Sequence, residues 1–158
     1  MTGYEGITFN DHERAVNACV NLALDLGLPL WIGEFGVGSS AYKARKWVED
    51  VLYLFDRYAL GYAWWSYWRD DRGMGLLYRD GKEKGELIQV LDRPYPRRNS
   101  MRQIHIYFEM EKGTFHVRYH AGRDKDLVTH IYIPRRHFTG FPDQYEIWVS
   151  DGSLYYEL

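Results

Sequence analysis

The chain has 158 residues, which is enough for one ordinary domain or two small ones. Its composition is globular, with 46% apolar, 27% charged and 17% aromatic residues, and its formal charge of −2 gives no electrostatic case for binding nucleic acid or an anionic membrane. The sequence holds no basic-then-apolar leader and no run of about 18 apolar residues. We therefore expect neither a signal peptide nor a membrane span in this chain, and its localisation stays unassigned.

A helix is predicted over residues 10–27. Asn10 and Glu13 have the spacing of a capping box, apolar and small residues then recur at helical intervals, and Gly27 favours a stop. The single cysteine, Cys19, falls on the apolar face of this helix. A lone cysteine forms no internal disulfide, so we expect a buried structural thiol rather than a nucleophile.

The next elements follow with short links. The continuous apolar run "LPLWIGEFG", residues 28–36, predicts a strand covered on both faces. Residues 40–61 have an apolar stripe at helical spacing, which predicts a second helix. Residues 61–68 ("GYAWWSYW") predict a second apolar strand, and residues 82–91 predict a short helix. This alternation is typical of parallel α/β architecture.

The pattern changes at "LDRPYPRRNS", residues 91–100, where prolines and polar residues interrupt it. Short alternating runs punctuated by glycine follow: "QIHIYFEM", "TFHVRYH", "LVTHIYIP", "YEIWVS" and "LYYEL". They predict about five antiparallel strands in a small sandwich. We therefore divide the chain into an α/β part, residues 1–96, and an all-β part, residues 97–158.

Glu34 closes the first predicted strand, and the stretch from Trp65 to Asp71 closes the second. The carboxyl ends of neighbouring parallel strands meet at one edge of a sheet, where reactive groups collect. Adjacent strand residues point to opposite faces, so only one of Trp64 and Trp65 faces such a site. A structural alternative for Glu34 is to cap the next helix or to pair with an arginine.

The ordered pair "LPLWIGEFG" and "GYAWWSYW" resembles the last two strands of the barrel in glycoside hydrolase family 5, which includes cellulases and endoglycoceramidases. The stretch "VTHIYIPRRHFTGFPDQYEIWVSDG" is similar to the C-terminal β-sandwich of the endoglycoceramidase-like members. This resemblance implies the C-terminal part of a (β/α)8 TIM barrel followed by a small antiparallel β-sandwich. It also implies a retaining glycosidase acting on a β-linked oligosaccharide, polysaccharide or glycolipid.

Carried over by the resemblance, Glu34 is the catalytic nucleophile and Trp65 is the platform beneath the sugar. Trp68, at the end of the second predicted strand, and Asp70 and Asp71, in the loop after it, are further substrate-binding candidates. No cofactor is expected. The histidines lack the ligand spacing of a metal site, so no metal is expected either.

The sequence departs from the family in one important respect. A complete barrel takes about 250 residues, and this chain has room for two of its strands. The Asn-Glu-Pro-like motif that carries the family's acid/base glutamate does not occur in it. We expect the missing N-terminal barrel portion, or self-association, to complete the fold. The alternative is a non-catalytic carbohydrate-binding or assembly module.

Overall fold

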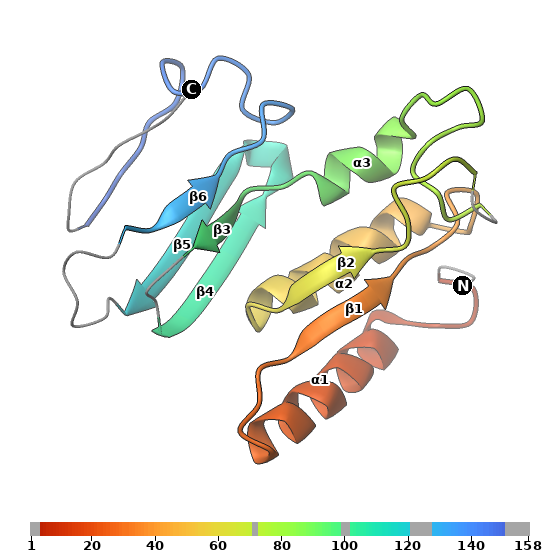
Figure 1. Ribbon diagram of the computed structural model, residues 1–158, viewed down its shortest axis with the longest axis horizontal. Helices are drawn as coiled ribbons and strands as arrows, with labels where there is room; N and C mark the ends of the chain where they lie inside the picture. Colours follow the sequence, from red (N-terminus) through yellow and green to blue (C-terminus); the bar gives the residue numbers. More distant parts are fainter. Residues whose placement is uncertain (1–3, 71–72, 99–101, 121–127, 151–158) are drawn as a thin grey trace.

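The computed structural model describes residues 4–70, 73–98, 102–120 and 128–150. The helices and strands among them are α1 (Phe9–Asp25), β1 (Trp31–Phe35), α2 (Ala44–Arg57), β2 (Gly61–Trp64), α3 (Gly85–Leu91), β3 (Tyr95–Arg98), β4 (Arg102–Glu109), a short 3-10 helix (Met110–Lys112), β5 (Thr114–His120) and β6 (His130–Tyr132). Figure 1 shows α1, β1, α2 and β2 gathered in one part of the molecule and β3 to β6 in another, with α3 between them.

The ends of α1 are set by local hydrogen bonds. The helix begins earlier than predicted, because the capping pair is Thr8 with Asp11 and not Asn10 with Glu13. The Thr8 backbone N–H and hydroxyl both donate to the Asp11 carboxylate, at 2.8 and 2.6 Å. At the other end Gly27 takes φ +64°, and the Leu28 N–H donates to the Ala23 carbonyl at 2.9 Å. This is the Schellman arrangement that glycine favours, so the predicted stop is confirmed.

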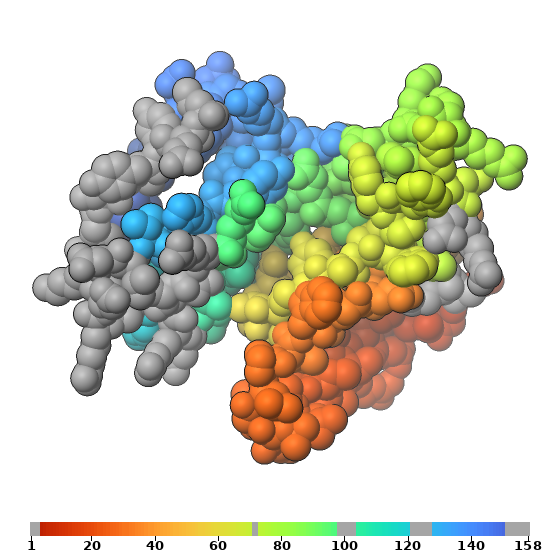
Figure 2. Space-filling view, viewed as in Figure 1, coloured from red at the N-terminus to blue at the C-terminus, as the bar shows by residue number. Residues whose placement is uncertain are grey.

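The apolar face of α1 is open, which corrects the prediction of a buried Cys19. Cys19 is exposed, no residue of α1 is buried, and Leu22 is 60% exposed. The physical reason is that α1 packs against α2, with Tyr58 donating to Asn17 at 2.5 Å, and its remaining surface has no cover among the described residues. Figure 2 shows α1 at the lower margin of the molecule.

The core of the α/β part lies between α2 and the two strands. The Phe35 ring is its centre, with the rings of Phe55, Tyr62 and Trp64 at 5.1, 5.4 and 5.1 Å. The predicted apolar stripe of α2 is confirmed, since its buried residues are Ala44, Trp47, Val48, Val51, Leu52, Leu54 and Phe55. Burying each large apolar side chain contributes about 1.5–3 kcal/mol, so α2 is the element that holds β1 and β2 in place.

β1 and β2 are parallel, as predicted, with Trp31 opposite Gly61 and Phe35 opposite Trp64. Two details of the prediction are wrong. β1 is covered on one face only, because α2 packs against Phe35 while Trp31 is 64% exposed. β2 ends at Trp64 and not at residue 68, since the chain there leaves the sheet for a loop.

The carboxyl-terminal part contains two antiparallel ribbons, β3 with β6 and β4 with β5. β3 lies inside the proline-containing stretch where no strand was expected. The predicted strand over residues 145–150 is irregular. There the Tyr145 ring packs against Phe138 at 5.2 Å, but Trp148 is 84% exposed and has no partner strand among the described residues. The predicted strand over 154–158 lies outside the described residues.

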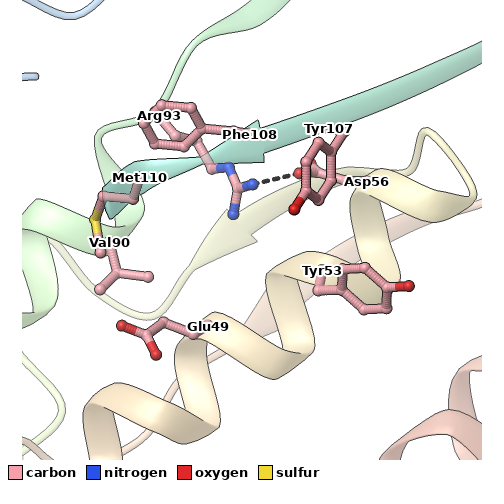
Figure 3. Close-up of a pocket in the computed structure, with 8 residues that line it drawn as sticks. All are labelled: Glu49, Tyr53, Asp56, Val90, Arg93, Tyr107, Phe108 and Met110. Carbon is pink, nitrogen blue, oxygen red and sulfur yellow. Dashed lines mark hydrogen bonds and ion pairs between the residues drawn. The ribbon is translucent and has the colours of Figure 1, made fainter. Parts of the chain in front are cut away.

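A buried ion pair fixes the segment after α3 against α2. Arg93, just after α3, donates to the carboxylate of Asp56 on α2, and its guanidinium lies 5.6 Å from the ring of Phe108 on β4. Figure 3 shows Arg93 between these two groups, at the wall of a hollow of about 80 Å³. The other residues that line this hollow are Glu49, Tyr53, Val90, Tyr107 and Met110. The pair therefore fastens the segment after α3 to α2 and places the Arg93 guanidinium against β4.

The same pair predicts a pH dependence of stability. Burial raises the pKa of Asp56 from 3.8 to about 6, and the Arg93 guanidinium opposes this shift in part. The folded state thus holds a proton that the unfolded state releases, so this group makes the free energy of unfolding fall as pH rises from about 4 to about 6. We expect Asp56→Asn to remove that fall in thermal unfolding measured between pH 3.5 and 7. Asp143→Asn, at an exposed carboxyl, is the matched control, and an Asp56→Asn profile parallel to that of the native protein would contradict the assignment.

Candidate active site

The pairing of β1 with β2 brings Glu34 and Trp65 to one end of the sheet. Phe35 lies opposite Trp64, and the backbone N–H of Trp65 donates to the Phe35 carbonyl at 2.8 Å. Figure 1 shows both strands ending at the side of the molecule where the connecting loops gather. Glu34, just before Phe35, and Trp65, just after Trp64, therefore lie close together at the ends of the two paired strands.

Glycine at position 36 permits this close approach. A Cβ at Gly36 would lie 2.5 Å from the Trp65 carbonyl oxygen, a distance that no side chain tolerates without displacing the backbone. Gly36 is itself buried, so neighbouring atoms leave no space for a side chain at this position. The second glycine of the "GEFG" motif is thus required for the packing of the two strand ends, whatever chemistry Glu34 performs.

Glu34 and Trp65 both lie outside the core. Phe35 and Trp64 point into the core, where their rings meet edge to face. Their neighbour Glu34, inside a register shift of β1, is exposed, and Trp65 follows the last residue of β2. Trp64 is fixed further by its indole N–H, which donates to the Met74 carbonyl at 3.2 Å, whereas Trp65 is 46% exposed.

The Glu34 carboxylate is exposed. It has no hydrogen bond or ion pair to any of the residues that the structure describes. The carboxylate stays in contact with solvent, because Glu34 lies on a strand whose Trp31 is 64% exposed. The capping and arginine-pairing alternatives find no contact to support them, and the carboxylate is free to meet a ligand from the open face.

The remaining predicted residues lie in the loop after β2. Trp68 is exposed. Asp70 accepts a hydrogen bond from Arg79 at 3.1 Å, and its carboxylate lies 3.7 Å from the Lys84 ammonium. Asp71 lies outside the described residues. Asp70 is thus engaged by two cations of its own loop, and the structure does not bring Trp68 or Asp70 into contact with Glu34.

Sequence reasoning missed a second hollow beside this loop, of about 240 Å³, lined by Ser39, Ser40, Tyr78, Lys84, Glu86 and Leu87. The Lys84 side chain is 5% exposed. Nothing in the charged run "KEKGEL" indicates a buried lysine, because such runs are ordinarily solvated. Neither hollow is lined by Glu34 or Trp65.

The described residues contain neither a cluster of metal ligands nor a membrane-spanning helix. Within them, no three His, Cys, Asp or Glu side chains are grouped to hold a metal ion. Their helices also include none with the length and apolarity needed to span a bilayer.

The C-terminal part of the chain matches a known protein family. Residues 93–158 match the glycoside hydrolase family 5 C-terminal domain, which confirms the predicted resemblance to the C-terminal part of such an enzyme. A search of curated proteins gave no match.

The fold is similar to that of endo-glycoceramidase II from Rhodococcus sp. in three solved complexes. With a five-membered iminocyclitol, the identity is 22%, the TM-score 0.68, and the alignment covers 86% of this chain and 30% of that chain. For its lactosyl-enzyme intermediate the values are 23%, 0.66, 82% and 29%, and for its ganglioside GM3 complex 21%, 0.63, 81% and 28%. This chain therefore spans less than a third of the length of the enzyme it resembles.

Proposed function

We propose that this chain, whose residues 93–158 belong to the glycoside hydrolase family 5 C-terminal domain, is the C-terminal part of a retaining β-glycosidase. Glu34 is its nucleophile and Trp65 its sugar platform. The observation that carries the proposal is the placement of a half-exposed indole and of an exposed carboxylate, which has no partner among the described residues, at the ends of adjacent strands. The fold shared with a glycosidase over most of this chain supports it.

The chemistry follows from these two groups. The Glu34 carboxylate attacks the anomeric carbon, a carboxylate–carbon bond forms, and the bond from that carbon to the leaving oxygen breaks. Water then displaces Glu34 from the same side as the departed group, so the configuration is retained. The Trp65 ring offers a flat apolar surface on which the apolar face of a pyranose can stack.

The proton donor of this reaction is assigned to residues outside this chain. A retaining site needs a carboxylic acid about 5 Å from the nucleophile. Glu34 is the one carboxyl residue in β1 and β2. We infer that a preceding portion of the barrel supplies it.

The open surface of α1 and β1 supports such a completion. Leu22, Leu26 and Trp31 are all more than half exposed, and among the described strands β1 pairs with β2 along one edge only. Further barrel strands and helices would cover these side chains and pair with the free edge of β1. The same surface would also serve self-association, which is the basis of the alternative function as a non-catalytic carbohydrate-binding or assembly module.

The two functions are separated by a substrate that needs no proton donor. We expect this chain to release dinitrophenol from 2,4-dinitrophenyl β-cellobioside or β-lactoside, because the leaving group departs as an anion. Azide should then displace Glu34 without base assistance and give the β-glycosyl azide. That product supports the two-step mechanism, whereas binding of the glycoside without any dinitrophenol release favours the module.

A further inference from the structure

We propose that Arg136, in the all-β part of the chain, is a positioning residue for the platform segment, residues 65–70, which begins with Trp65. It acts through Glu83, in the loop that follows β2. The inference rests on the proposed function and adds to it a contribution from the all-β part. In Figure 2 the blue atoms of the segment after β6 reach the green lobe that follows β2.

The Arg136 guanidinium bridges two carboxylates of the α/β part. Its Nη2 donates to Glu83 at 2.8 Å, and its Nε donates to Asp92 at 3.2 Å. Two bonds from one planar guanidinium fix its orientation, which the ammonium of a lysine cannot do. The three side chains are between 27% and 38% exposed. A partly shielded network of this kind holds its members in place better than an isolated surface pair.

The turn that carries Arg136 is itself held in place. Pro134 and Phe138 lie on either side of Arg136 and are buried, and the Phe138 N–H donates to the Pro134 carbonyl at 3.1 Å. The neighbouring His137 places its Nε2 at 2.6 Å from the Gln89 carbonyl oxygen of α3. Arg136 therefore extends from a fixed support towards the loop after β2.

Glu83 connects Arg136 to the platform segment. One carboxylate oxygen of Glu83 accepts from Arg136, and the other accepts from the Tyr67 hydroxyl at 3.3 Å. Tyr67 lies two residues after Trp65, within the platform segment. A single carboxylate thus joins a group of the all-β part to a group beside the proposed sugar platform.

Backbone hydrogen bonds make Glu83 and the platform segment one unit. Leu77 is bridged to Glu83, and its N–H donates to the Trp68 carbonyl at 3.1 Å. The preceding Leu76 N–H donates to the Ser66 carbonyl at 3.0 Å. A shift of Glu83 therefore shifts the backbone that follows the platform residue.

Trp65 stands where the sheet and this unit meet. Its N–H donates to the Phe35 carbonyl of β1 at 2.8 Å, whereas the chain beyond it depends on the unit that Arg136 holds. Release of Arg136 should let the Trp65 ring take more orientations, which weakens stacking on the sugar in the ground state and the transition state alike. Such a loss raises KM and leaves kcat nearly unchanged.

The first test needs no substrate and follows hydrogen exchange at the amides of Leu76, Leu77 and Asp70, the last of which donates to the Leu77 carbonyl at 2.9 Å. We expect Arg136→Ala to speed exchange at these amides about 3- to 10-fold. Arg136→Lys should restore the native rate in part. Arg135→Ala, at the exposed arginine next to it, is the matched control and should exchange like the native chain.

The second test measures release of dinitrophenol from 2,4-dinitrophenyl β-cellobioside. We expect Arg136→Ala to raise KM about 3- to 10-fold, with kcat within about twofold of the native value. Tyr67→Phe, which removes only the hydroxyl, should raise KM in the native chain and add little to Arg136→Ala, because both changes break the same connection. Glu83→Gln carries both tests if Arg136→Ala does not fold.

The outcomes separate this inference from the proposed function. Equal exchange in Arg136→Ala and Arg135→Ala overturns the inference, as does a chain that releases dinitrophenol with an unchanged KM or with a change confined to kcat. If Arg136→Ala speeds exchange but the native chain releases no dinitrophenol, the hold of Arg136 on the platform segment is supported and the proposed function fails.

Discussion

Replacement of Arg93 by Ala is expected to lower the free energy of unfolding by about 3–5 kcal/mol at pH 8. The change leaves the Asp56 carboxylate buried without its cation, and it removes the guanidinium that lies over the Phe108 ring. Breaking a buried pair on one side costs more than the pair itself contributes, because the remaining charge is uncompensated. Urea unfolding followed by circular dichroism measures the loss.

The pH dependence of that loss identifies its cause. Burial already raises the pKa of Asp56 to about 6, and without Arg93 this pKa moves further up. At pH 4 Asp56 is protonated, so the penalty of a buried charge disappears and the loss should shrink. Arg97→Ala, at an exposed arginine of β3, is the matched control. An Arg93→Ala loss no larger than that of Arg97→Ala, or equal at pH 4 and pH 8, would show that the pair does not hold the segment after α3 against α2.

Replacement of Glu34 by Gln is expected to lower release of dinitrophenol from 2,4-dinitrophenyl β-cellobioside on the order of 10³-fold or more. The amide keeps the shape of the side chain but is not a nucleophile towards the anomeric carbon. Because the side chain is exposed and makes no contact within the described structure, stability should change little. Cellobiose affinity should also stay within about twofold, since the Trp65 platform is untouched.

The matched control for this variant is Glu146→Gln, which removes an exposed carboxylate in the C-terminal part. It should leave the release of dinitrophenol at the native rate. If Glu34→Gln and Glu146→Gln behave alike, the exposed carboxylate at the end of β1 is not the nucleophile, and the chain is better regarded as a binding or assembly module.

Local patterns predicted the elements that depend on nearby residues. The stripe of α2 and the stop at Gly27 follow from helical periodicity and from the conformational freedom of glycine, and both are confirmed. The parallel pairing of β1 and β2 followed from the alternation of helix and strand. The start of α1 was misplaced because Asn10 and Thr8 are both good capping residues, and only the contact with Asp11 distinguishes them.

Features that depend on distant residues could not be predicted. The burial expected for Cys19 and Trp31 assumes neighbouring elements that are not among the described residues. The pair of Asp56 with Arg93 joins positions far apart in the chain and has no local signature. For the site, sequence placed Glu34 and Trp65 on adjacent strand ends, but it missed the buried Lys84, whose surroundings are made by the folding of a loop on itself.

The central claim is that Glu34 forms a covalent bond with a sugar, and intact-protein mass spectrometry tests it most directly. The chain is incubated with 2,4-dinitrophenyl 2-deoxy-2-fluoro-β-cellobioside, whose fluorine slows hydrolysis of the intermediate and whose leaving group needs no acid. The account predicts a mass increase of one fluorocellobiosyl unit, located by peptide mapping at Glu34 and absent from Glu34→Gln. No increase in the native chain, or a label on another residue, would contradict it.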